Sequence, residues 1–192
     1  QEEVLASHEG TDEKTAQSPL TTLPPTSSPT SGIRGVEAVS ICHQAGWHAP
    51  ISNQPIYNLL DRHWEDDVFP VTARRGLGNV CFSPLAEGLL TGKYSKGTPA
   101  DARAADETKG QFIRRRFSES NLERVRRLGR IAADLGVPLS NLALRWCLRR
   151  SEVSSCIIGA SRPEQILENV TGPDLDWNPE VEARVIAAIG DG

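Results

Sequence analysis

The feature that most constrains this chain of 192 residues is an alternation of short, predominantly apolar strand segments with helical segments. Strands are predicted at residues 51–57, 79–82 and 153–158. Strands that alternate with helices are typical of parallel βα units. Continuously apolar strands are expected where both faces of a sheet are buried. The sequence therefore predicts an α/β fold whose three strands belong to a larger, incomplete sheet.

The helices are predicted from apolar spacing and from the residues at their ends. The sequence indicates helices at residues 33–45, 64–75, 122–135, 140–150 and 179–189, and a further helix that starts after Ser161. Ser140 is the predicted N-cap of the fourth helix. Asn178 is the predicted N-cap of the last helix, with Pro179 in its first position. Residues 95–117 are predicted to form a loop, because they combine glycine, proline and many charges.

Two segments at strand ends have residues suited to binding anions. In residues 82–94, glycines bracket a turn that ends at Lys93, so backbone N–H groups there could hold phosphate oxygens. Residues 157–165 place a helix start directly after a strand, with Ser161 and Glu164 in a capping-box pattern and Arg162 beside them. The first segment lacks Walker spacing, and the second also fits an ordinary capped helix with a solvated arginine.

A third segment, residues 53–60, places a polar amide inside an apolar strand. A buried amide needs a hydrogen-bonding partner. From spacing alone, Gln54 is interpreted either as a satisfied core residue beside an edge proline or as part of a binding site.

The first 31 residues differ in composition from the rest. Residues 15–31 contain 13 Ser, Thr or Pro among 17 residues, which is typical of a disordered segment. We therefore predict a low-complexity leader at 1–31 and a folded region at 32–192. The chain contains no methionine, even at position 1, which indicates a trimmed or partial translation product.

Charge and cysteine content exclude several classes of function. The net charge of −4 argues against nucleic-acid binding, which normally requires a basic excess. No apolar run approaches the roughly 18 residues that a membrane span needs. The four cysteines form no C-x-x-C pair and sit among apolar neighbours. They are expected to be reduced, in a cytoplasmic protein without a metal site.

Four stretches together, in order and spacing, resemble the C-terminal half of an aldo-keto reductase. The similarity is to the branch of L-glyceraldehyde 3-phosphate reductases and voltage-gated potassium channel β-subunits. The matching stretches are Gln54 to Leu60, Phe82 to Tyr94, Ala143 to Trp146, and Ile158 to Gln165 followed by Glu168 to Val170. The resemblance covers roughly residues 33–190.

The resemblance implies part of a (β/α)8 TIM barrel, strands 6–8 with their helices, which binds NADP(H) at the carboxyl ends of the strands. Gln54 would bind the nicotinamide amide and Phe82 would stack on its ring. The pyrophosphate and other phosphates would be contacted by Ser83, Pro84, Leu85, Gly88, Lys93 and Arg103. The adenosine end would be held by Gly159, Ser161, Arg162, Gln165, Glu168 and Asn169, with Ser161 and Arg162 nearest the 2′-phosphate.

The family's catalytic half has no counterpart in this sequence. The family reduces carbonyls with a tyrosine acid tuned by lysine and aspartate, beside a histidine, and all four precede the strand that carries Gln54. Tyr57 and Tyr94 match cofactor-half motifs instead. A whole barrel needs about 250 residues. We therefore assign no catalytic residue and expect no reductase activity from this chain alone.

Three interpretations remain open from the sequence. The chain is part of an NADPH-dependent aldo-keto reductase, or a non-catalytic nucleotide-binding or interaction module like the channel β-subunits, or a degenerate remnant without a stable fold. For the complete protein, the resemblance implies a small carbonyl substrate, of the glyceraldehyde 3-phosphate or methylglyoxal type, and is compatible with a homo-oligomer.

Overall fold

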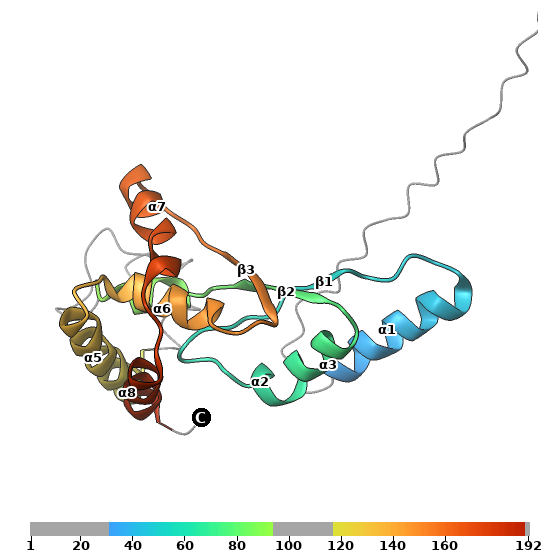
Figure 1. Ribbon diagram of the computed structural model, residues 1–192, viewed down its shortest axis with the longest axis horizontal. Helices are drawn as coiled ribbons and strands as arrows, with labels where there is room; N and C mark the ends of the chain where they lie inside the picture. Colours follow the sequence, from blue (N-terminus) through green and yellow to red (C-terminus); the bar gives the residue numbers. More distant parts are fainter. Residues whose placement is uncertain (1–30, 94–116, 191–192) are drawn as a thin grey trace, which may run out of the picture.

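The computed structural model describes residues 31–93 and 117–190, and the observations below concern these two ranges. Helices and strands alternate along most of the chain, as the sequence predicts (Figure 1). The elements in chain order are α1 (Ser31–Ala45), β1 (Ser52–Asn53), α2 (Trp64–Asp67), α3 (Phe69–Arg74), β2 (Gly78–Phe82), η1 (Ala86–Thr91), α5 (Glu119–Asp134), α6 (Leu139–Leu148), β3 (Val153–Ile157), α7 (Pro163–Val170), η3 (Gly172–Asp174) and α8 (Pro179–Ile189).

The three strands form one sheet in the order β1-β2-β3, and all of them run parallel. The predicted α/β architecture with a parallel sheet is therefore confirmed. The first strand is much shorter than the predicted range 51–57, because Pro55 lacks an N–H to donate to a neighbouring strand. Pairing resumes beyond it, where Ile56 forms an isolated parallel bridge with Phe82.

Helices α3 and α6 pack on β2 and β3, respectively, and cover one face of the sheet. Asn79 on β2 points to this covered face, where its Nδ2 donates to Thr72 Oγ1 on α3 at 2.8 Å. Cys81, two residues further along β2, is fully buried on the same face. The register shifts between Asn79 and Val80, and beyond this irregularity Cys156 on β3 lies beside Cys81.

The opposite face of the sheet is poorly covered within the described residues, and we call it the open face. It carries the residues that alternate with the buried positions, namely Ser52, Gln54, Ile56, Val80, Phe82, Ser155 and Ile157. Each of these is half-buried or exposed, and Ile157 keeps 46% of its surface. The prediction that both faces of every strand are buried is therefore wrong for this part of the chain.

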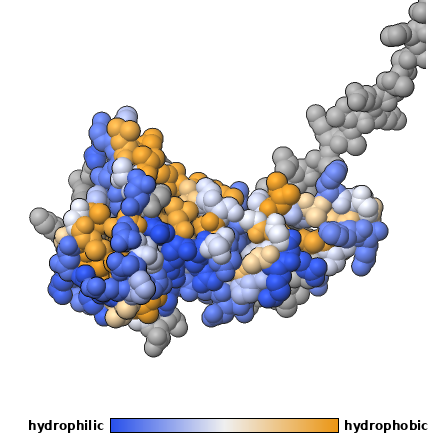
Figure 2. Space-filling model, viewed as in Figure 1, coloured by the Kyte–Doolittle hydropathy of each residue, from blue (hydrophilic) through white to orange (hydrophobic). Residues whose placement is uncertain are grey.

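Exposed apolar side chains also mark helix α7, which follows β3. Figure 2 shows a hydrophobic surface over α7 that continues toward β3. Its exposed members on the helix are Ile166, Leu167 and Val170, with Leu167 at 69%. A contiguous apolar surface of this kind is typical of a region that packs against something else.

The core on the covered side is organised around stacked aromatic rings. Tyr57 stacks on Trp146 with ring centroids 4.8 Å apart and meets Phe69 edge-on at 4.9 Å. The guanidinium of Arg149 lies over the Trp146 ring at 4.1 Å. All three aromatic residues are fully buried. This cluster packs α6, through Trp146, against Tyr57 before α2 and Phe69 on α3.

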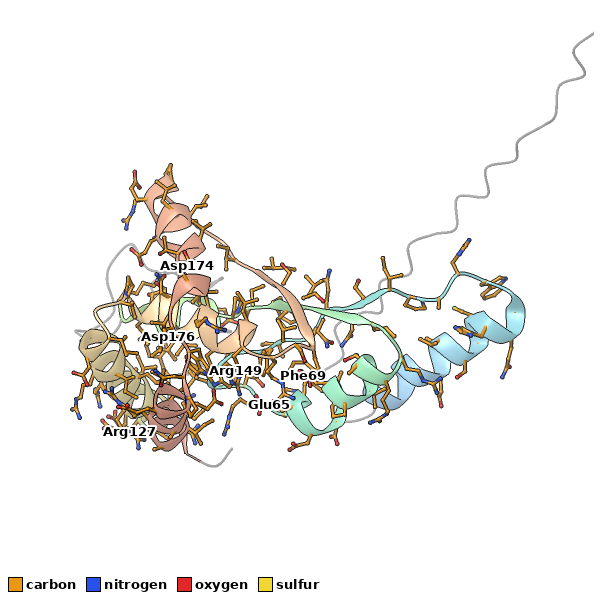
Figure 3. The ribbon with its side chains drawn as sticks, viewed as in Figure 1. Glu65, Phe69, Arg127, Arg149, Asp174 and Asp176 are labelled. Carbon is orange, nitrogen blue, oxygen red and sulfur yellow. The ribbon has the colours of Figure 1, made fainter. Side chains whose placement is uncertain are left out.

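A network of charged side chains surrounds the hydroxyl group of Tyr57 at the edge of this core. Arg149 Nη1 donates to the Tyr57 hydroxyl at 3.0 Å, and Tyr57 in turn donates to Glu65. Arg149 Nε donates to Glu182 on α8 at 3.1 Å. Figure 3 shows Arg149 and Glu65 side by side beneath the sheet. Burial raises the pKa of Tyr57 well above its usual range, so the phenol stays protonated.

The helix ends match the prediction at some positions and differ at others. Asn178 caps α8 as predicted, since its Oδ1 accepts from the N–H groups of Glu180 and Val181. Ser140 is not the N-cap of α6, because the helix already begins at Leu139, preceded by Pro138. The hydroxyl of Ser140 is buried and donates to Glu168 on α7. This serine therefore joins two helices and does not cap one.

The amino end of the described region also differs slightly from the prediction. Helix α1 begins at Ser31, one residue before the predicted start of the folded region. It ends before Gly46, whose φ of +68° allows the chain to turn as expected. Residues 1–30 of the predicted leader and residues 95–116 of the predicted loop lie outside the described residues. In the described ranges, no helix has the length and apolarity that crossing a membrane requires.

We expect two glycines to respond oppositely to substitution by alanine. A Cβ on Gly172 would lie 3.3 Å from the backbone of Asn141, whereas a Cβ on Gly129, inside α5, would meet no atom within 4 Å. Gly129→Ala should raise the free energy of unfolding by about 1 kcal/mol through helix propensity. Gly172→Ala should lower it by about 1–2 kcal/mol through overpacking between η3 and α6. Urea denaturation followed by circular dichroism measures both, and equal effects would contradict the packing described.

We also expect Tyr57 to resist ionisation until the chain unfolds. Because its folded pKa is raised, the neutral phenol contributes stability fully below the ordinary tyrosine pKa of about 10, and this contribution is lost at higher pH. In a Tyr94→Phe variant, Tyr57 is the sole tyrosine. Its phenolate absorbance should rise together with the loss of far-ultraviolet circular dichroism. Ionisation near pH 10 with the helices intact would contradict the buried network.

Candidate functional site

The parallel sheet brings the three predicted binding segments to a single edge. Phe82 is the register partner of Ile157 and the bridge partner of Ile56, so these residues form one row across the strands. Parallel strands present their carboxyl ends on the same side of a sheet. The chain segments that follow this row therefore leave the sheet together, at the edge where α/β sheets bind ligands.

Gln54 and Phe82 both belong to the open face. Gln54 is exposed and lies two residues before Ile56, just after the short first strand. Phe82 is half-buried at the last position of β2. The interpretation of Gln54 as a satisfied core amide is therefore wrong, since the side chain is not in the core. An exposed amide and a half-buried aromatic ring on one face of the sheet are groups that can bind a flat, polar ring.

The turn after β2 has an unusual backbone. Ser83, Ala86 and Glu87 have φ values of +52°, +47° and +58°, and Gly88 has +100°. Residues other than glycine seldom adopt such values, and the strain tends to occur where a backbone is held for function. Within this turn Pro84 is buried, whereas Ser83, Leu85 and Gly88 remain partly accessible. Lys93 is exposed just beyond η1.

Asn58 holds this strained turn in place, and the sequence alone did not single it out. The side chain is fully buried, and its Nδ2 donates to the carbonyl oxygen of Ser83 at 3.0 Å. The same carbonyl accepts from the N–H of Ala86 at 2.9 Å. Asn58 Oδ1 accepts from the N–H of Leu60. A polar residue in an apolar stretch indicated that Asn58 needs a hydrogen-bonding partner. The partner lies 25 residues away, so the sequence did not identify it.

The start of α7 is exposed at the same sheet edge. Gly159, Ser161 and Arg162 are all exposed. The predicted pairing of Ser161 with Glu164 is shifted by one residue, because Arg162 is the N-cap and Gln165 supplies the acceptor. Gln165 Oε1 accepts from the N–H groups of Ser161 and Arg162 at 2.8 and 3.2 Å. The Arg162 side chain extends from a helix start whose dipole already favours an anion.

The two remaining predicted residues lie on the far turn of α7. Glu168 is exposed, and its Oε1 accepts from the Ser140 hydroxyl at 3.0 Å. Asn169 is buried, with 7% of its surface accessible. Glu168 therefore joins α7 to α6 in the structure as it stands, and Asn169 lies in the interior beside it. Arg103 lies outside the described residues.

The arrangement offers groups suited to an anionic, ring-containing ligand. Arg162 and Lys93 provide exposed positive charge, while Gln54 and Phe82 provide an amide and an aromatic surface. Tyr57 lies on the covered side, fully buried and hydrogen-bonded to Glu65 and Arg149. Since its pKa is raised as well, Tyr57 is unsuited to protonate a ligand on the open face.

Comparison with known proteins finds similarity over most of the chain. The model of the aldo/keto reductase family matches residues 30–185. The chain is 41% identical over 157 residues to a probable voltage-gated potassium channel subunit beta of Oryza sativa subsp. japonica, covering 80% of this chain and 48% of that protein. It is 42% identical over 143 residues to a putative subunit beta of Schizosaccharomyces pombe, covering 71% and 41%.

A second kind of relative is an enzyme. The chain is 37% identical over 167 residues to the L-glyceraldehyde 3-phosphate reductase of Escherichia coli O157:H7, covering 83% of this chain and 47% of that protein. The chain thus spans about half the length of the curated relatives it matches, and the predicted branch is confirmed. With the family model covering most of the described residues, the chain belongs to the aldo/keto reductase family.

Proposed function

We propose that residues 32–192 are the NADP(H)-binding half of an aldo-keto reductase barrel, and that the complete protein reduces a small carbonyl compound. β1, β2 and β3 would be strands 6–8 of a (β/α)8 barrel, with the open face as part of the barrel interior. The reduction of an aldehyde of the glyceraldehyde 3-phosphate or methylglyoxal type is the activity that fits the enzymatic relatives.

The observation that carries this proposal is the convergence of three segments on the carboxyl edge of the sheet. They are the Gln54 strand, the strained turn after Phe82, and the start of α7 at Arg162. Barrel enzymes place their sites at this edge. The segments are far apart in the sequence, so an unrelated function would not require them to meet there.

The exposed groups are chemically suited to NADP(H). Gln54 offers an amide for the nicotinamide carboxamide, and the half-buried Phe82 offers a ring face for stacking. When bound, this cofactor supplies a hydride, while the residues of this chain only position it. The phosphates would be contacted by the turn formed by Ser83, Pro84, Leu85 and Gly88, together with Lys93 and Arg103. The adenosine end would be held by Gly159, Ser161, Arg162, Gln165, Glu168 and Asn169.

The exposed groups at the start of α7 are best suited to bind the 2′-phosphate of the cofactor. Arg162 is exposed at the helix start and carries a guanidinium, which suits bidentate phosphate binding. The Ser161 hydroxyl is also exposed, and it donates to Gln165 Oε1 on α7 at 3.2 Å. A phosphate could replace Gln165 as the acceptor of this hydroxyl without disturbing the helix.

The open face and the two outer strands of the described sheet, β1 and β3, are consistent with half of a barrel. All-parallel sheets occur almost only where both faces are covered. Within the described residues, β1 and β3 each pair with β2 alone, and Ile157 and Leu167 remain exposed on β3 and the helix that follows it. The remaining strands of a barrel would pair with these two edges and bury the open face. They would also supply the catalytic tyrosine.

We expect NADP⁺ to stabilise this chain and the substitution Arg162→Ala to weaken that effect selectively. A ligand that binds the folded state alone raises stability by about 2.7 kcal/mol at 100 times its Kd. Loss of a charge-assisted hydrogen bond of about 1.5–3 kcal/mol should raise the Kd for NADP⁺ by about 10- to 100-fold. Affinity for NAD⁺, which lacks the 2′-phosphate, should change little. Thermal denaturation with each nucleotide measures the shift.

The matched control is Arg127→Ala, which removes an exposed arginine of α5, a helix separate from the strand-end segments (Figure 3). This variant should respond to NADP⁺ like the unsubstituted chain. If millimolar NADP⁺ leaves the denaturation midpoint of the unsubstituted chain unchanged, the chain is not an autonomous cofactor-binding unit. An equal loss for NADP⁺ and NAD⁺ in Arg162→Ala would contradict the 2′-phosphate assignment.

We further expect the chain alone to show no reductase activity, because Tyr57 is sequestered and no other described residue is a tyrosine. The assay follows NADPH oxidation with glyceraldehyde or methylglyoxal. Turnover comparable to that of a complete family member would show that a proton donor has been overlooked.

A further inference from the structure

Three successive hydrogen bonds join the segment after β1 to the end of β2. The Phe82 N–H donates to the carbonyl oxygen of Pro55 at 3.0 Å, and the Tyr57 N–H donates to the carbonyl oxygen of Phe82 at 3.3 Å. The third bond comes from a side chain, since Asn58 Nδ2 donates to the carbonyl oxygen of Ser83 at 3.0 Å. The contact between the two segments therefore continues from the last residue of β2 into the turn.

A side chain makes the third bond because the backbone leaves the sheet at Ser83. The φ of Ser83 is +52°, in the left-handed region, so an extended strand cannot continue through this residue. The N–H of Asn58 is engaged elsewhere and donates to the carbonyl oxygen of Asp61 at 3.2 Å. The side-chain amide of Asn58 thus takes the place of a backbone donor where the strand ends.

The hydrogen bonds of Asn58 hold its side chain in one orientation. Its N–H and its carbonyl oxygen both pair with Asp61, and its Oδ1 accepts from the N–H of Leu60 at 2.9 Å. With Nδ2 bonded to Ser83, each polar group of this fully buried residue has a partner. A buried side chain locked in this way is suited to fix the position of another segment.

The segment that Asn58 contacts needs such support. Ser83, Ala86 and Glu87 all have positive φ values, and such conformations persist only where the surrounding structure determines them. The carbonyl oxygen of Ser83 accepts from the Ala86 N–H at 2.9 Å, so Asn58 bonds to the same atom that closes the first part of the turn. Loss of the Asn58 donor should therefore allow the turn to adopt other conformations.

We propose that Asn58 is a positioning residue for the cofactor, which holds the turn after β2 in the conformation that contacts the pyrophosphate. This inference rests on the proposed function, which assigns the turn formed by Ser83, Pro84, Leu85 and Gly88 to the phosphates. Apparent affinity falls with the fraction of molecules in the binding-competent conformation. Asn58 should thus set the affinity for the pyrophosphate and leave binding of the adenosine end at α7 unchanged.

The substitution Asn58→Asp tests this role on the full chain. It keeps the size of the side chain but replaces the donating amide group by an oxygen, and a carboxylate cannot donate to the Ser83 carbonyl oxygen. If about one molecule in ten then has a competent turn, the Kd for NADP⁺ should rise about tenfold. The Kd for 2′-AMP, which has the adenosine and the 2′-phosphate but no pyrophosphate, should change less than about twofold. Isothermal titration calorimetry measures both constants.

The matched control is Asn79→Asp. Asn79 is also fully buried, and its Nδ2 likewise donates to a backbone carbonyl oxygen, that of Glu152 at 2.8 Å. Its side chain lies on the covered face and bonds to Thr72 instead of the turn. Asn79→Asp should therefore lose stability but keep the NADP⁺ affinity of the unsubstituted chain. An equal loss of NADP⁺ affinity in the two variants would overturn the proposal, because general destabilisation would then explain it.

Hydrogen exchange tests the turn without any nucleotide. In Asn58→Asp, the amides of residues 83–90 should exchange at least about tenfold faster, whereas those of α6 should keep their rates. Unchanged exchange in the turn would overturn the role of Asn58 alone, as would an equal loss of affinity for NADP⁺ and 2′-AMP. Failure of the unsubstituted chain to bind either nucleotide would instead contradict the proposed function.

The unsubstituted chain gives a second measurement that does not require Asn58→Asp to fold. One Nδ2 proton of Asn58 is donated to Ser83 within the protein, whereas Asn178 is exposed. In NMR spectra, this proton should exchange at least about tenfold more slowly than the side-chain amide protons of Asn178. Equal exchange rates for the two side chains would overturn the proposal.

Discussion

The parallel pairing of β2 with both of its neighbours is the constraint on which the rest of the structure depends. It places Ile56, Phe82 and Ile157 in one row, so that three segments distant in sequence leave the sheet at one edge. The same pairing gives the sheet two unlike faces. One face is covered by α3 and α6, and the other remains open, which is a stable arrangement for a parallel sheet only when something further covers it.

Two sets of side chains maintain this arrangement from the covered side. The stacked pair of Tyr57 and Trp146 and the network of Arg149 with Glu65 and Glu182 hold α6, α8 and the first strand together. Asn58, next to Tyr57, reaches instead toward the sheet edge and fixes the Ser83 carbonyl. Two successive residues therefore have different roles: Tyr57 packs in the core, and Asn58 holds the strained turn after β2.

The open face connects the fold to the proposed function. In a chain that spans about half the length of its relatives, the carboxyl edge of the sheet is accessible and an apolar surface at β3 and α7 is exposed. Both features are expected of the proposed cofactor half of a larger barrel.

Local patterns in the sequence determined the elements: apolar periodicity located the helices, the apolar run at residues 79–82 located β2, and Asn178 with Pro179 located the start of α8. These features depend on neighbouring residues, so one sequence suffices to recognise them. Tertiary structure alone decided that Ser140 contacts Glu168 instead of capping α6 and that Asn58 holds Ser83. Each of these contacts joins separate parts of the chain, and burial of a polar group shows that a partner is needed without showing which residue provides it.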